Sequence, residues 1–198
     1  MYPKARIEAL TDGLFGVAMT ILVLDVRLPD DFHPADQAEL ARALLALWPK
    51  FLPYALSFYV LGSTWLANIK LRARGEFVDQ RYAAWWMLYL LLATCIPFST
   101  SVVGRFIHYD AAIWLYTFNM ATLSAVGYRL TVLLPDVEHD KHLLDRKVSL
   151  LLLFCTSLLC AALSPVAHGR ALWVYLLNVG APHLVQWIEI RRRVSRKS

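Results

Sequence analysis

The sequence predicts an all-α, polytopic membrane protein with six transmembrane helices per subunit and with both termini in the cytoplasm. The chain of 198 residues is 58% apolar and only 18% charged, whereas a soluble domain is typically about 45–50% apolar and about 25% charged. The apolar residues gather in blocks, most of them near the ~20 residues that a helix needs to cross a bilayer. Basic residues flank those blocks, as orientation signals do.

Six apolar blocks use most of the chain, so we expect one membrane domain over residues 1–198 and no separate soluble domain. The predicted spans are residues 7–28, 48–69, 83–106, 111–134, 148–164 and 171–190. Between the first two spans, the run LARALLALW predicts a short amphipathic helix. Pro53, Pro97 and Pro182 fall inside apolar blocks, where each can kink its helix.

The orientation follows from the basic residues. Fifteen of the 20 Lys and Arg residues lie at the two termini or in the loops after the second and fourth spans, and five lie on the other side. This bias indicates that both termini are cytoplasmic, and we expect a multi-pass protein of the plasma membrane. Because the basic residues sit beside apolar blocks, we do not expect a nucleic-acid partner despite the net charge of +5.

The first span carries ionisable residues, which are costly in a membrane and often mark function. At about 100° per residue, the side chains of Ile21, Leu24 and Leu28 lie within about 40° of Val17, with Thr20 on the flank. Asp12 points about 140° away from this apolar stripe. Asp25 lies about 80° off the stripe, at the far end of the span.

Two interpretations of the first span remain open. In one, the stripe is ordinary helix packing, with Arg6, Glu8 and Asp12 paired at the cytoplasmic interface. In the other, the stripe faces a symmetry axis, where rings of apolar side chains form a constriction that gates by dewetting. Asp12 then belongs to a structural network that holds the pore helix, because it faces away from the axis.

Arg6, followed after three residues by Leu10-Thr11-Asp12-Gly13 and the apolar run LFGVAMTILVLDVRLP, resembles the first-helix signature of the transmembrane-protein-175 potassium channel family. That signature is Arg, three residues, Phe-Ser-Asp and an apolar helix ending in an acid and a Pro. The run WPKFLPYALSFYVLGSTWLANIK is similar to the family's second helix. The similarity covers roughly the first 130 residues.

The resemblance implies a homotetramer of six-helix subunits in the lipid bilayer, as in prokaryotic members with a single repeat. It implies a pore for K⁺ and related monovalent cations, lined by the first helix. The family's constriction corresponds to Val17, Ile21 and Leu24, with a pore-facing hydroxyl at Thr20 and Leu28 also lining the pore. Other roles are also expected: a structural network of Arg6, Thr11, Asp12 and Trp65, and Asp25 at the outer mouth, where it attracts cations.

The chain departs from the family pattern at three places. Leu10-Thr11-Asp12 replaces Phe-Ser-Asp, so the hydroxyl and the carboxylate remain and the aromatic ring does not. Val17 is smaller than the family's usual Ile or Leu, which widens the innermost ring. After Trp65 the family commonly has Asn-His-His, and this chain has Ala67-Asn68-Ile69. The hydrogen bonds between the first two helices must therefore differ.

Other chemistry is not indicated. We find no phosphate-binding glycine loop, nucleophile elbow or HExxH, and expect no catalytic residue, no metal and no cofactor. His139 and His142 lie in a charged loop at loose spacing, which is typical of a solvated turn. The run 124–129, SAVGYR, superficially resembles a potassium filter but continues a helical pattern. A secondary or proton-coupled transporter and a non-conducting scaffold are the alternatives to a channel.

Overall fold

The computed structural model describes residues 2–71, 77–133 and 141–180, without the side chains of residues 70, 71, 77, 141, 142 and 179. Within these residues the fold is helical apart from two short strands, β1 (Tyr2–Pro3) and β2 (Phe77–Val78). The strands pair antiparallel, with Tyr2 opposite Val78, and connect the start of the first helix to the segment before α4. The sequence did not predict this pair. The all-α class is otherwise confirmed.

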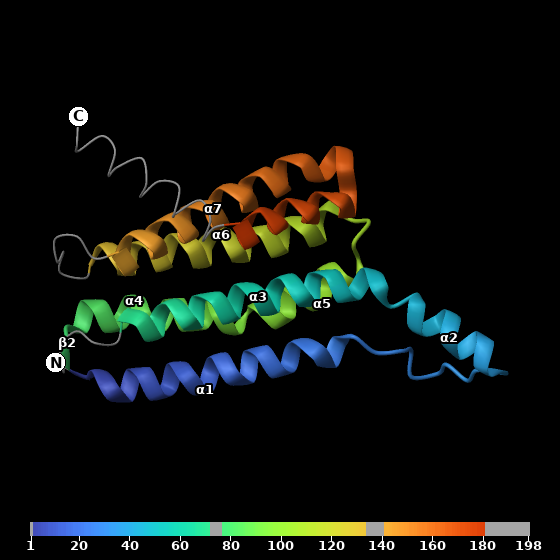
Figure 1. Cartoon of the computed structure of the whole chain (residues 1–198), viewed down its shortest axis with the longest axis horizontal. Helices are drawn as coiled ribbons and strands as arrows, with labels where there is room; N and C mark the ends of the chain where they lie inside the picture. Colours follow the sequence, from blue (N-terminus) through green and yellow to red (C-terminus); the bar gives the residue numbers. More distant parts are fainter. Residues whose placement is uncertain (1, 72–76, 134–140, 181–198) are drawn as a thin grey trace.

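The helices fall in three layers that run along one common direction (Figure 1). In chain order they are α1 (Lys4–Leu22), the 3-10 helix η1 (Val23–Asp25), α2 (Gln37–Leu45), α3 (Trp48–Leu71), α4 (Gln80–Thr94), α5 (Ile96–Arg105), α6 (Asp110–Val132), α7 (Lys141–Ala167) and the 3-10 helix η2 (His168–Gly180). The first layer is α1 alone, the second holds α3, α4 and α5, and the third holds α6, α7 and η2.

Three helical stretches of the described residues are long and apolar enough to cross a membrane: Lys4–Asp25, Gln80–Arg105 and Leu143–Asn178. A fourth candidate is α2 with Trp48–Ile69, which meet at a bend of 44°. The α2 segment is the predicted amphipathic helix, and the Asp36 carboxylate caps it by accepting a 2.6 Å bond from the Glu39 amide. The six-span count and the position of the termini stay predictions.

The third predicted span consists of two helices, because α4 ends at Thr94 and α5 begins at Ile96. Pro97 stands in the first turn of α5. It has no amide hydrogen to donate, and its ring clashes with the carbonyl four residues earlier, so a continuous helix is interrupted here. The two helices still form one straight stretch in Figure 1.

The helices at the fifth and sixth predicted spans begin earlier than the spans themselves. Helix α7 begins at Lys141, seven residues before the predicted start at residue 148, and it encloses charged residues that resembled a loop. At His168, where φ is +46°, the chain turns back and η2 runs beside α7. Residues 181–190 of the sixth span, with Pro182, lie outside the described residues, as does His139.

Helix α6 is deeply enclosed, with 13 of its 23 residues buried. It contains the filter-like run 124–129, which is helical as predicted. A Cβ atom on Gly127 would lie 3.1 Å from side-chain atoms of Tyr89 and Leu150. Gly127 therefore allows α6 to approach α4 and α7 closely, which is a packing role.

Hydroxyl and amide groups connect the second and third layers. The Ser57 hydroxyl of α3 lies 2.7 Å from that of Thr100 in α5 and 3.0 Å from that of Tyr116 in α6. The Asn119 amide of α6 donates to the Ser99 hydroxyl of α5 at 3.1 Å, and within the third layer the Asn178 amide of η2 donates to the Thr156 hydroxyl of α7 at 3.0 Å. Both amides thus bind a neighbouring helix, as polar side chains between packed membrane helices do.

We expect Ser57→Ala to lower the free energy of unfolding by about 1 kcal/mol, because it leaves the buried Tyr116 hydroxyl without its partner. The measurement is reversible unfolding in mixed detergent and lipid. Ser149→Ala is the matched control, since Ser149 is exposed on α7, and we expect a change within about 0.5 kcal/mol. Equal effects of the two substitutions would contradict the network.

Candidate pore helix

Helix α1 has one buried and one exposed face. Thr11, Phe15, Ala18 and Leu22 are buried, at spacings of four, three and four residues that place them on one side of a helix. On the other side, the exposed fractions of Val17, Ile21 and Leu24 are 55%, 45% and 67%, and Thr20 is also exposed. The structure therefore leaves uncovered the same stripe that the sequence singled out.

The position of α1 explains this asymmetry. The helix packs against α3, α4 and α5, and it forms the outer edge of the bundle (Figure 1). Phe15 is completely buried in the main core. Burial of a side chain of this size contributes about 1.5–3 kcal/mol, which fixes the rotation of α1 about its own axis.

The Thr20 hydroxyl bonds its own helix. It donates to the Val17 carbonyl at 2.8 Å, and it also lies 3.1 Å from the Gly16 carbonyl. A hydroxyl that donates its hydrogen in this way keeps its oxygen lone pairs, so it can still accept a bond or coordinate a cation.

Leu28 lies beyond the helical part of the first span. Helix α1 ends at Leu22, and the 3-10 helix η1 ends at Asp25. The projection at 100° per residue assumed that the helix continues through residue 28, and that assumption was wrong. The pore-lining role of Leu28 stays a prediction without this geometric support.

Asp25 has a cationic partner. Its Oδ1 accepts bonds from Arg105 Nη2 at 2.6 Å, Arg105 Nε at 3.1 Å and Ser101 Oγ at 2.9 Å. These contacts attach the end of the first span to α5. The role of Asp25 in attracting cations stays a prediction, and Arg105 offsets part of the carboxylate charge that it requires.

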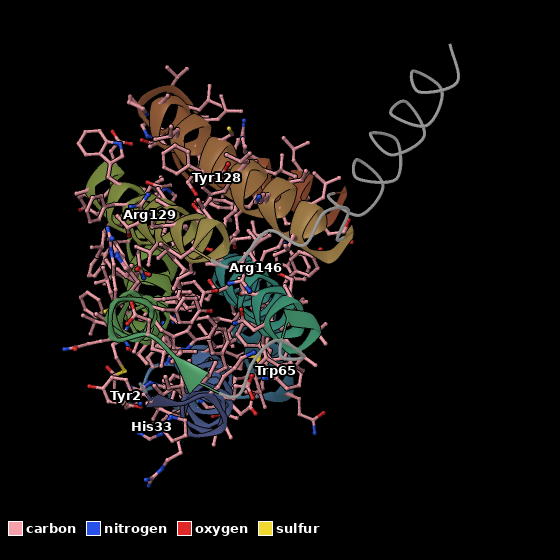
Figure 2. All side chains as sticks on the ribbon, turned by 90° about the vertical axis from the view of Figure 1, so that its left-hand side faces the viewer. Tyr2, His33, Trp65, Tyr128, Arg129 and Arg146 are labelled. Carbon is pink, nitrogen blue, oxygen red and sulfur yellow. The ribbon has the colours of Figure 1, made fainter. Side chains whose placement is uncertain are left out.

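The motif residues near the start of α1 bind two tryptophans. Trp65 Nε1 of α3 donates to Asp12 Oδ1 at 2.8 Å, and Trp86 Nε1 of α4 donates to the Thr11 hydroxyl at 2.8 Å. Thr11 itself donates to the Ile7 carbonyl at 2.7 Å. Figure 2 shows Trp65 between α3 and α1. Sequence reasoning missed Trp86, which lies inside the third predicted span and belongs to no motif.

Arg6, the first residue of the motif, is exposed. Within the part of the chain that the structure describes, its side chain makes no hydrogen bond or ion pair. The structure thus places three of the four predicted network residues in contact with neighbouring helices. The network role of Arg6 remains a prediction.

A groove of about 550 Å³ lies beside the exposed stripe. One wall is formed by Val17 and Ile21 of α1 and Leu24 of η1, and the other by α4 and α5, through Thr94, Pro97 and Phe98. Asp25 and Arg105 close one end. The groove is therefore mainly apolar, and its charged residues lie at the end where the first span stops.

We expect the double substitution of Asp12→Asn and Trp65→Phe to reveal a coupling of about 1 kcal/mol in the free energy of unfolding. The reason is that the indole N–H donates to a carboxylate that is only half-buried. The measurement is a double-mutant cycle on the detergent-solubilised protein.

Trp173→Phe with Asp12→Asn is the matched cycle, because Trp173 is an exposed tryptophan on η2, and its coupling should be near zero. A zero coupling for Trp65 as well would show that the bond contributes nothing to stability.

Comparison with known proteins gives consistent matches. Residues 6–97 match the family described as endosomal/lysosomal potassium channel TMEM175. A potassium channel of Streptomyces collinus is 30% identical over 57% of this chain and 53% of its own length. A potassium channel of Chamaesiphon minutus is 31% identical over 54% of this chain and 52% of its own length. The chain thus aligns with about half the length of these curated relatives.

One solved structure is similar over nearly the whole chain. It is the crystal structure of a lysosomal potassium-selective channel TMEM175 homolog from Chamaesiphon minutus. The identity is 26%, the TM-score is 0.59, and the match covers 94% of this chain and 96% of that one. The similarity therefore includes α6, α7 and η2, which lie beyond the part matched by the family model.

Proposed function

The chain belongs to the family of the endosomal/lysosomal potassium channel TMEM175, and we propose that it forms a potassium-selective or weakly selective cation channel. Its pore is lined by α1. The single observation that carries this proposal is the uncovered stripe of Val17, Ile21 and Leu24, opposite a buried face that fixes the orientation of the helix.

The stripe fits a constriction better than it fits a ligand site. Its three side chains are apolar, so copies of α1 around an axis produce stacked apolar rings, and such rings gate an aqueous pore by dewetting. Thr20 provides hydroxyl oxygens beside the rings, where a partly dehydrated cation needs them. The smaller Val17 makes the innermost ring wider than those at Ile21 and Leu24.

The assembly is a homotetramer of six-span subunits. The helix at the edge of the bundle is the one that four copies can bring to a common axis, and the groove beside it can receive apolar side chains of a neighbouring α1. The bias of basic residues toward the termini supports cytoplasmic ends in the plasma membrane. K⁺ is the permeating ion, and conduction requires no cofactor.

We expect Ile21→Asn to raise passive K⁺ efflux from proteoliposomes about tenfold, which corresponds to a barrier lower by about 1.4 kcal/mol, because the amide wets the constriction. Leu151→Asn is the matched control: Leu151 is 47% exposed on α7, against 45% for Ile21, and lies in the opposite layer. Its efflux should equal that of the wild type.

Cysteine substitutions test directly whether the copies of α1 meet at the symmetry axis. In a background without native cysteines, oxidation should join two subunits carrying Ile21→Cys, and silver ions should block their K⁺ flux. Leu151→Cys should do neither. If the Ile21→Cys variant stays monomeric on oxidation and its K⁺ flux is insensitive to silver, the proposal that α1 lines the pore is wrong. Uptake that is coupled to a pH gradient and is abolished by Asp12→Asn would indicate a transporter instead.

A further inference from the structure

The outermost residue of the exposed stripe lies on a turn that has no buried side chain. Leu24 belongs to η1, none of whose residues is buried, and it is 67% exposed. The last buried residue before it is Leu22, at the end of α1, which is only 2% exposed. Apolar packing therefore fixes the first span as far as Leu22 but does not by itself fix the position of Leu24.

Hydrogen bonds to α5 hold this turn. The Oδ1 atom of Asp25, the last residue of η1, accepts bonds from Ser101 Oγ at 2.9 Å and from Nη2 and Nε of Arg105 at 2.6 Å and 3.1 Å. A further bond lies two residues beyond, where Lys50 Nζ donates to the Arg27 carbonyl at 3.3 Å. The three bonds to Asp25 are shorter, and they act next to Leu24 in the chain.

This ion pair has more support than an ordinary surface pair, which usually contributes little. The Asp25 side chain is only 18% exposed, and Ser101 adds a third donor to the same oxygen. Arg105 stands in the last turn of α5, where the negative end of the helix dipole favours a cation. Helix α5 is itself fixed in the core, since Ile96 and Val103 are fully buried. Asp25 is thus bound to a rigid neighbour.

The direction of this contact is important. Helix α5 lies in the second layer, and α1 forms the outer edge of the bundle (Figure 1). Asp25, Ser101 and Arg105 meet at one end of the groove that separates the exposed stripe from α5. The contact therefore holds η1 toward its own subunit, and so away from any axis that the exposed stripe faces.

We propose that Ser101 and Arg105 are positioning residues that bind Asp25 and so hold the Leu24 ring of the pore open. This inference rests on the proposed function, because the ring exists only if α1 lines the pore. Without the contact, the Leu24 side chains of neighbouring subunits approach one another, since their association removes apolar surface from water. The outer ring then narrows and loses its water, which stops conduction.

A purely electrostatic role of the pair predicts a different pattern of K⁺ flux. If Asp25 acts only by attracting cations, Arg105→Gln makes the outer mouth more negative and raises the flux, most strongly at low ionic strength. Asp25→Asn then lowers it. If the pair positions Leu24, both substitutions lower the flux, and the double variant is no worse than either single variant, because each removes the same contact.

The test is passive K⁺ efflux from proteoliposomes at low and at high ionic strength. We expect Arg105→Gln to lower the flux about tenfold at both. Adding Leu24→Ala should restore the flux to that of Leu24→Ala alone, because the shorter side chain cannot close the ring. Arg170→Gln is the matched control, since Arg170 is an exposed arginine near the start of η2 in the third layer, and it should conduct as the wild type does.

Ser101→Ala removes one donor with little change of volume, so it remains informative if Arg105→Gln does not fold. We expect it to lower the flux about threefold. An unchanged or higher flux in both variants would overturn the positioning role, and so would a low flux that Leu24→Ala does not restore.

The Ile21→Asn variant separates this inference from the proposed function on which it rests. If Ile21→Asn raises the K⁺ flux while Arg105→Gln and Ser101→Ala leave it unchanged, α1 lines the pore and only the positioning role is wrong. If Ile21→Asn leaves the flux unchanged as well, the pore along α1 and the positioning role both fail.

Discussion

The burial of one face of α1 against α3, α4 and α5 is the constraint on which the rest of the site depends. With Phe15 enclosed in the core, the helix cannot rotate without exposing a large side chain. The stripe of Val17, Ile21 and Leu24 is therefore kept exposed by the packing on the opposite face of the helix. Bonds from Trp65 and Trp86 hold the first turns, and the Asp25–Arg105 contact holds the last. Helix α1 is thus oriented along its whole length by its neighbours.

The polar groups of the bundle follow two patterns. In its middle, the hydroxyls of Ser57, Thr100 and Tyr116 satisfy one another, as the absence of water in a bilayer core requires. At the end where α7 begins, the buried guanidinium of Arg146 donates to the Asn68 side chain and so connects α7 to α3.

Helix α6 shows why hydropathy and burial must be considered separately. It is not among the stretches that are apolar enough to count as candidate spans, yet it is deeply enclosed. A helix surrounded by protein need not be apolar all round, because its polar side chains find partners in other helices. Thr117, Asn119 and Ser124 are buried in this way. The similarity of the whole chain to a solved channel of the family includes this helix.

Local patterns in the sequence were sufficient to predict several features of the structure. Hydrophobic blocks located α3 and α6 within a few residues, and the first-helix motif indicated the family. The 100° periodicity identified the exposed stripe, because a helix repeats its faces regularly wherever it continues. The capped amphipathic helix α2 followed from the same kind of pattern.

Other features depend on contacts between residues that are distant in sequence, and only the tertiary structure decided them. The helical part of the first span ends at Asp25, whose side chain binds Arg105 of α5, so Leu28 lies outside the helix. The bond from Trp86 to Thr11 and the burial of Arg146 beside Asn68 join residues 75 and 78 positions apart. A charged residue looks the same in a sequence whether it lies in a loop or between helices, since only the packing of its neighbours decides whether water reaches it.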